Sequence, residues 1–235
     1  MLKDDIIEIE KILGFKNKVP QLLQTAFTHR SYLNEHPDYE NPSNERLEFL
    51  GDAVLQFLIT EFLYRKYPHY PEGTLTSIRA ATVNTQSLAD EARRLQYGNF
   101  LLLSRGEEES GGRGRDYILA NTFEAVLGYL FLEHGIRSGN TFLKKNLFYK
   151  IEQTVKNETY HDFKSTFQEL SQEKKGATPT YEVLEEWGPD HDKRFKIGLF
   201  IGKTQYGTGT GPSKQKAEQA AAKDGLENWK KASIM

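Results

Sequence analysis

The chain lacks cysteine altogether, which excludes disulfides and thiolate metal sites and suits a reducing compartment. No apolar run approaches the ~18 residues that a membrane span requires. The N-terminal stretch MLKDDIIEIEKILGF has acidic residues where a signal peptide carries an uninterrupted apolar core. With 37% hydrophobic and 27% charged residues, the 235-residue chain suits one large or two small globular domains. We predict a cytoplasmic protein with no membrane partner.

An excess of either charge sign is also missing, since the formal net charge is -2. Residues 162–235 hold 12 basic and 11 acidic residues, and residues 1–161 hold 19 and 22. Bulk charge therefore does not indicate a nucleic-acid-binding protein, and such a function has to be argued from local placement.

The first two thirds of the chain show the helical period throughout. The glycine-rich stretch 104–116 interrupts this pattern, and we predict a surface loop there. We predict an all-α domain over residues 1–154. Its expected helices are Ile6–Leu13, Gln21–Thr28, Glu45–Tyr67, Thr74–Leu95, Ile118–His134 and Gly139–Glu152.

The pattern changes after the polar segment 155–161, which we predict to be a linker. A helix from Phe163 to about Lys174 precedes strand-like segments, and apolar residues alternate over 195–201. A tight turn is expected at Gly202–Lys203, and Ser213 is the expected N-cap of a last helix. Residues 162–231 are therefore predicted to form an α+β (α-β-β-β-α) module with both helices on one face of the sheet.

The segment NERLEFLGDAVL, residues 44–55, carries three carboxylates in an apolar helix. At about 100° per residue, Glu45, Glu48 and Asp52 fall within a sector of roughly 60°. Asn121 and Glu124 form a similar pair three residues apart in a second apolar helix. Oxygen ligands clustered in this way suit Mg²⁺ or Mn²⁺. Spacing alone nevertheless favours another explanation, in which Glu45 and Asp52 are solvated surface residues and Glu124 is salt-bridged.

Four blocks, in order, resemble the ribonuclease III family: QTAFTHRSY, NERLEFLGDAVL, PEGTLTSIRAATVN and SGGRGRDYILANTFEAVLG. Residues 162–231 resemble a double-stranded-RNA-binding domain. The resemblance covers almost the whole chain and implies a multidomain protein, an all-α endonuclease domain followed by the α+β module. It implies a homodimeric, Mg²⁺-dependent endoribonuclease for double-stranded RNA, with no small-molecule cofactor. Its products would carry 5′-phosphate and 3′-hydroxyl ends with two-nucleotide 3′ overhangs, from rRNA, mRNA and other structured RNA.

The resemblance also assigns residues. In metal-assisted hydrolysis, metal ions activate a water molecule and stabilise the leaving 3′-oxygen, so no nucleophilic side chain is required. His29 is therefore expected to be structural. In the family, the Phe at the position of Phe49 inserts into the partner subunit, so the resemblance implies the same role for Phe49. Its helical position alone favours a core residue. The resemblance implies that Mg²⁺, or Mn²⁺ in its place, is held by Glu48, Asp52, Asn121 and Glu124. The catalytic acids that it implies are Asp52, Glu124, Glu45 and Glu72.

One position departs from the family, which normally has Asp where this chain has Asn121. An amide oxygen still binds Mg²⁺ but brings no negative charge. We expect lower metal affinity and a lower cleavage rate, with RNA binding intact. The residue is either a natural variant of a working enzyme or an introduced substitution. The alternative function is a double-stranded-RNA-binding protein with an impaired nuclease site.

Three places in the module match the family's RNA contacts, which read shape over about 16 base pairs. Gln215 and Glu218 depart from the basic cluster usual near the start of the last helix. Arg113 and Arg115 are further candidates for backbone contacts. The matching residues are Ser165, Gln168 and Gln172 on the first helix, His191 in the loop 188–192, and Lys214 and Lys216 at the last helix.

Overall fold

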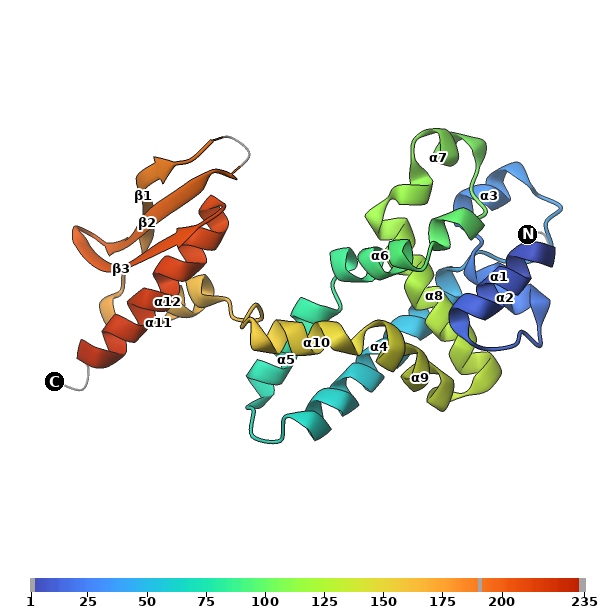
Figure 1. The fold of residues 1–235 in the computed structure, drawn as a ribbon, viewed down its shortest axis with the longest axis horizontal. Helices are drawn as coiled ribbons and strands as arrows, with labels where there is room; N and C mark the ends of the chain where they lie inside the picture. Colours follow the sequence, from blue (N-terminus) through green and yellow to red (C-terminus); the bar gives the residue numbers. More distant parts are fainter. Residues whose placement is uncertain (1–2, 190–191, 233–235) are drawn as a thin grey trace. The chain divides into compact units, whose positions relative to one another are not determined.

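The computed structural model describes residues 3–189 and 192–232 and divides into two compact units, Met1–Tyr160 and His161–Met235 (Figure 1). The predicted contact His191 lies outside the described residues. Across the described ranges, no helix is both long and apolar enough to cross a bilayer.

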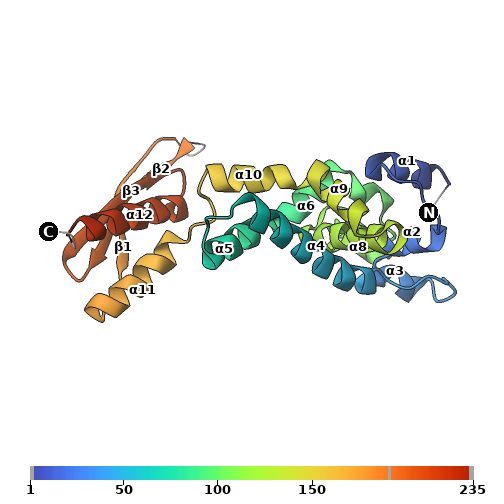
Figure 2. The same ribbon diagram turned by 90° about the horizontal axis from the view of Figure 1, so that it is seen from below.

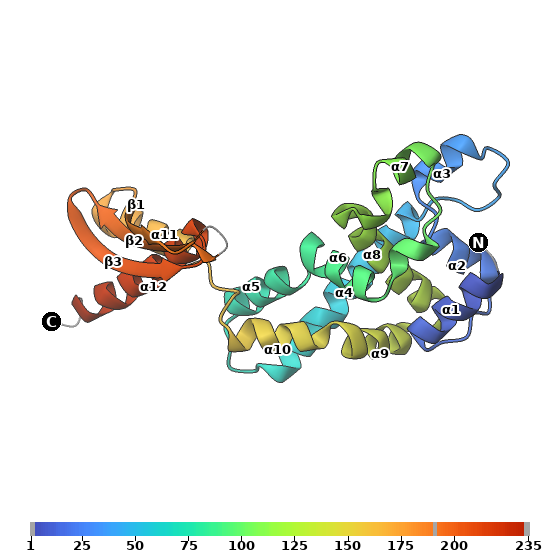
Figure 3. The same ribbon diagram turned by 45° about the horizontal axis from the view of Figure 1, so that its top comes forward.

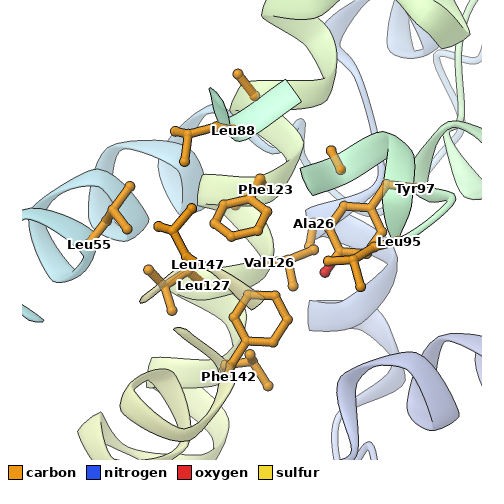
Figure 4. Packing of buried hydrophobic residues seen from close by; sticks show 14 of the residues in the cluster. Ala26, Leu55, Leu88, Leu95, Tyr97, Phe123, Val126, Leu127, Phe142 and Leu147 are labelled. Atoms are coloured by element: carbon orange, nitrogen blue, oxygen red, sulfur yellow. The ribbon is translucent and has the colours of Figure 1, made fainter. Parts of the chain in front are cut away.

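The first unit is entirely helical, as the sequence predicts, and α8 (Asp116–His134) is its central helix. Figure 4 shows Phe123, Val126 and Leu127 of α8 among apolar side chains from other helices, including Leu55 and Phe142. Around α8 lie α1 (Lys3–Leu13), α2 (Pro20–Ala26), α3 (Arg30–Glu35), α4 (Glu45–Lys66), α5 (Glu72–Thr82), α6 (Thr85–Arg94), η1 (Tyr97–Phe100), α7 (Arg105–Glu109), η2 (Gly112–Gly114), α9 (Ile136–Asn146) and α10 (Phe148–Lys156).

The closest helix packing in this unit joins α4 to α8, and it depends on two glycines. A Cβ added at Gly51 would lie 1.8 Å from the Glu124 carbonyl oxygen, and one at Gly128 would lie 2.3 Å from the Leu47 carbonyl oxygen. Glycine inside a helix costs roughly 0.5–1 kcal/mol relative to alanine, and here it permits contact between the two backbones. The crossing fixes how the two helices face each other.

Three sequence predictions for this unit are wrong in detail. The stretch 104–116 is not a loop throughout, because Ser104 caps α7 by accepting a 3.2 Å hydrogen bond from the Glu107 amide. The single helix expected over 74–95 is two helices, since the Asn84 side chain caps α6 through the Ser87 amide at 2.9 Å. The helix expected over 139–152 breaks at Leu147 into α9 and α10, which follow one another along one side of the unit (Figures 2 and 3).

A buried ion-pair network fastens α6 to α10. The Glu91 side chain is 2% exposed and lies 2.7 Å from Arg94 and 3.1 Å from Lys150. Burial alone would raise the pKa of Glu91, but hydrogen bonds from Tyr149, Arg94 and Lys150 outweigh it and lower the pKa. The folded unit therefore keeps this carboxylate ionised.

The second unit has the predicted order of helix, three strands and helix. Its strands form an antiparallel sheet in the order β1-β2-β3, and Gly202 and Lys203 make the turn between β2 and β3. Phe167 and Leu199 belong to one core with alanines of α12, so both helices pack on the same face (Figure 3). Its elements are α11 (Phe163–Lys175), β1 (Thr180–Trp187), β2 (Arg194–Ile201), β3 (Thr204–Gly211) and α12 (Lys214–Ala232).

The segment expected to link the two domains, 155–161, begins within the last turn of α10. Ser213 accepts a hydrogen bond from the Lys216 amide at 3.3 Å, which is the capping role predicted for it.

Candidate functional site

The α4–α8 crossing brings the acidic faces of both helices together. Gly51 lies against the Glu124 backbone, so its sequence neighbour Asp52 is placed beside α8. Glu48, one turn earlier on α4, is half-buried and hydrogen-bonded to the Asn121 side chain. The four predicted metal ligands therefore belong to one region of the surface.

The electrostatics confirm that these carboxyls are neighbours. Burial, together with repulsion from Asp52 and Glu48, raises the pKa of Glu124 to about 7. Burial and repulsion from Glu45 and Asp52 also raise the pKa of Glu48, against the hydrogen bond from Asn121. Both shifts come first from burial and then from the repulsion between neighbouring carboxylates.

In the described parts of the chain, no three His, Cys, Asp or Glu side chains converge closely enough to form a ready-made metal cluster. The donor set nevertheless fits a hard cation, because all its donor atoms are carboxylate or amide oxygens and its carboxyls repel one another. Asp52 is further held by a 3.2 Å hydrogen bond from Gln56. The arrangement can hold a divalent cation once its carboxylates turn inward.

Glu45 lies at the edge of this acidic region. Its side chain is 57% exposed, accepts a 2.9 Å hydrogen bond from Ser43 and lies 3.6 Å from the Arg30 guanidinium. Repulsion from Glu45 contributes to the raised pKa of Glu48, which places Glu45 near the predicted ligands.

Among the predicted catalytic acids, Glu72 does not lie near the others within the chain. It accepts a 2.9 Å hydrogen bond from Thr76 and lines a cavity of about 800 Å³ between α4 and α5, which also includes Thr60. Thr60 is eight residues beyond Asp52 on α4, roughly 12 Å along the helix axis. Glu72 therefore lies apart from the acidic region of its own chain.

His29 has a structural role at the start of α3. Its Nδ1 atom accepts from the Ser31 amide at 3.3 Å and lies 2.8 Å from the Ser31 hydroxyl. Burial lowers the pKa of His29, so the neutral ring is favoured.

Phe49 is 82% exposed, which excludes a core position within the chain. Phe57 at 58% and Tyr64 at 74% exposure lie on the same side of α4, about two and four turns further on. Exposed aromatic side chains in such a line favour contact with another protein surface.

In the second unit, the predicted contacts on the two helices are exposed. Ser165, Gln168 and Gln172 line a groove of about 560 Å³ on α11 together with two acidic residues, Glu169 and Glu173. The Ser165 hydroxyl donates to Asp162 at 2.6 Å and so remains free to accept. Lys214 and Lys216 are exposed in the first turn of α12.

The departure at Glu218 has a structural consequence, because Glu218 pairs with Lys164 at 2.6 Å and ties α12 to α11. Arg113 and Arg115 are also engaged within the chain. The Arg113 guanidinium donates to the carbonyl oxygens of Gly98 and Leu101 at 2.8 and 2.9 Å, and Arg115 pairs with Glu107 at 2.7 Å.

Gly51 and Gly128 position the acids through backbone packing, and neither glycine was among the predicted site residues. A signal was present, because each glycine interrupts a long apolar helix near an acidic pair, and an isolated helical glycine often marks close packing. Pairing the two glycines required knowing which helices cross.

Comparisons with known proteins find matches for both units of the chain. Residues 19–151 match the family model Ribonuclease-III-like, and residues 163–228 match the double-stranded RNA binding motif. Ribonuclease 3 of Streptococcus sanguinis is 48% identical over 206 residues, 88% of each chain. Ribonuclease 3 of Geobacillus kaustophilus is 43% identical over 225 residues, 96% of this chain and 91% of the relative.

Among solved structures, the nuclease domain of Campylobacter jejuni ribonuclease III matches with a TM-score of 0.56 at 38% identity, covering 61% of this chain and 93% of that chain. A second structure of that domain, described for flexibility in a region involved in dimer formation, matches with a TM-score of 0.55 at 38% identity, covering 60% and 94%. The comparisons lend no support to the alternative of an RNA-binding protein with an impaired nuclease site. A helical nuclease unit and an RNA-binding unit, both matched in order, identify the chain as a member of the ribonuclease III family of endoribonucleases.

Proposed function

We propose that this chain cleaves double-stranded RNA with Mg²⁺ at the acidic face of α4 and α8, with Mn²⁺ as a possible substitute ion. The observation that carries the proposal is the α4–α8 crossing, which places Asp52 and Glu48 beside Glu124 and Asn121. Products would be 5′-phosphate and 3′-hydroxyl ends with two-nucleotide 3′ overhangs.

Four residues on α4 and α8 have a proposed role in binding the cation. Glu48, Asp52, Asn121 and Glu124 would hold the cation. The chemistry that Mg²⁺ supplies when bound is activation of a water nucleophile and charge stabilisation at the leaving 3′-oxygen. Glu124, whose pKa is about 7, is the carboxyl most in need of a cation to stay ionised. The packed helices limit side-chain movement, which favours a fixed geometry at the phosphate.

A homodimer would complete the enzyme. The exposed aromatic side chains of Phe49, Phe57 and Tyr64 support α4 as the subunit interface. Two acidic sites related by a two-fold axis could address the two strands of one duplex, and a second copy offers a route for Glu72 to reach an acidic site.

The second unit would hold the duplex. We assign residues 1–154 to the nuclease, 155–161 to the connection and 162–231 to RNA binding. Ser165, Gln168 and Gln172 suit 2′-hydroxyls in the shallow minor groove, while Lys214 and Lys216 suit phosphates. His191 is retained as a contact from the sequence pattern. Precursors of rRNA and structured mRNA in the cytoplasm are the natural substrate class.

The deciding experiment is incubation of the purified chain with a labelled RNA duplex and Mg²⁺. We expect discrete short duplexes with staggered ends, and no cleavage by Asp52→Asn, which should still bind the duplex. A control change, Lys16→Gln, removes an 89% exposed charge paired with Glu10 and should cleave normally. Retention of the duplex without cleavage by the unmodified chain would refute the nuclease assignment.

A further inference from the structure

An exposed arginine on α3 lies at the edge of the acidic region. Arg30 is the first residue of α3, its side chain is 72% exposed, and its Nη1 atom lies 3.6 Å from the Glu45 carboxylate. The catalytic scheme gives this side chain no role. Its contact with Glu45, whose charge contributes to the raised pKa of Glu48, places a cation at the edge of the region where RNA would be cut.

The backbone around Arg30 is fixed by several hydrogen bonds. The Asn44 amide donates to the Thr28 carbonyl at 2.8 Å, which ties the segment before α3 to the start of α4. The His29 amide donates to the Leu102 carbonyl at 3.1 Å, and the His29 ring caps α3. Arg30 therefore begins from a rigid position beside the first turn of α4, although its side chain is exposed.

The hydrogen-bonding capacity of Arg30 is largely unused. A separation of 3.6 Å is too long for a hydrogen bond, so the contact with Glu45 is a loose ion pair. In the ranges 3–189 and 192–232 it is the single ion pair found for Arg30. By contrast, Arg113 and Arg115 use their guanidinium groups on carbonyl oxygens or carboxylates at 2.7–3.1 Å. Arg30 is thus free to accept an external anion.

The acidic region needs such a cation when RNA binds. Backbone phosphates entering it meet carboxylates of the same sign, which repel them. A bound metal ion would act on the phosphate being cut, and Arg30 is an exposed cation at the edge of this region for a neighbouring phosphate. A guanidinium presents a planar fork that matches two phosphate oxygens.

We propose that Arg30 binds a backbone phosphate of the RNA duplex next to the scissile phosphate, exchanging its loose contact with Glu45 for this partner. The inference rests on the proposed function. It makes Arg30 a substrate-positioning residue that contributes to affinity and register and carries no base preference.

The test compares Arg30→Gln and Arg30→Lys with a control, Arg137→Gln. Arg137 is an exposed arginine on α9, beyond the end of α8, which ends ten residues or about 15 Å after Glu124. Binding of the full chain to an RNA duplex is measured in EDTA over a range of salt concentrations, and steady-state cleavage is measured in Mg²⁺.

For Arg30→Gln we expect duplex affinity to fall about 10-fold and KM to rise by a similar factor, with kcat nearly unchanged. The slope of log affinity against log salt should become shallower by about 1. Arg30→Lys should keep the salt slope but bind more weakly than the unmodified chain. Arg137→Gln should match the unmodified chain in every measurement.

Three results would overturn the proposal. Unchanged affinity and an unchanged salt slope for a folded Arg30→Gln protein would show that Arg30 does not bind a phosphate. A lower kcat with unchanged affinity would mean that Arg30 acts only through Glu45. If Arg30→Gln failed to fold, the assignment of an exposed binding residue would also be wrong. Failure of the unmodified chain to bind or cut the duplex would instead refute the proposed function.

Discussion

The α4–α8 crossing provides the sharpest test of how the fold builds the site. We consider Gly51→Ala, which adds one methyl group where the two backbones touch. The new Cβ would lie 1.8 Å from the Glu124 carbonyl oxygen and 2.5 Å from its carbonyl carbon. An ordinary contact begins near 3.4 Å, so α8 must retreat from α4 by about 1.6 Å.

This displacement has two consequences of calculable size. Overpacking of a close-packed interior costs about 1–3 kcal/mol of unfolding free energy. For a unit of this length, that corresponds to a fall of about 2–12 °C in the unfolding midpoint. A misplacement of roughly 1 Å at a reacting centre costs about 100-fold in rate. The carboxylates of Asp52 and Glu124 move apart by at least that distance.

Thermal unfolding and Mg²⁺-dependent cleavage of an RNA duplex measure the two effects separately. The matched control is Gly106→Ala in α7, where nothing lies within 4 Å of the added Cβ. That variant should be unchanged or stabilised by up to about 1 kcal/mol. A Gly51→Ala protein with normal stability and normal cleavage would show that the glycine contact does not determine the site geometry.

Three further predictions concern single side chains. Asn121→Asp should tighten Mg²⁺ binding in calorimetry and raise the cleavage rate, because it restores a negative ligand; equal rates at all Mg²⁺ concentrations would contradict this. Phe49→Ala should weaken the dimer in sedimentation experiments, whereas Leu132→Ala, which shortens a 54% exposed side chain of α8, should not; a fully dimeric Phe49→Ala protein would count against the interface. Glu91→Gln should lower the unfolding free energy by about 3 kcal/mol at neutral pH. The folded-state pKa of Glu91 is lowered, so its stabilisation is present above the ordinary carboxyl pKa and disappears as pH falls through the lowered value. The free energies of unfolding of the two proteins in urea should therefore converge in acid. A difference that stays constant with pH would contradict the prediction.

Much of this protein could be predicted from residue patterns because those patterns report local preferences. Helical periodicity predicted the all-helical first unit, and the two-residue alternation over 195–201 predicted a strand, which is β2. Ser213 and the turn at Gly202 followed from the same kind of rule. Local caps were less predictable. The cap at Asn84 interrupts apolar spacing that runs through it, and the cap at Ser104 starts a short helix in a glycine-rich stretch that has no apolar spacing.

Residue patterns alone indicated the family and predicted which residues would carry the chemistry, namely the acidic motif of α4 and the Asn121–Glu124 pair. Which of these residues come together depends on how the helices pack. The contact between Gly51 and the Glu124 backbone brings α4 to α8, while Glu72 stays near Thr60 at the other end of α4. Tertiary structure also placed Arg30 beside Glu45 and turned Phe49 outward. The physical reason is that helix periodicity fixes the faces of each helix, whereas the distance between two faces depends on packing contacts between residues far apart in the chain.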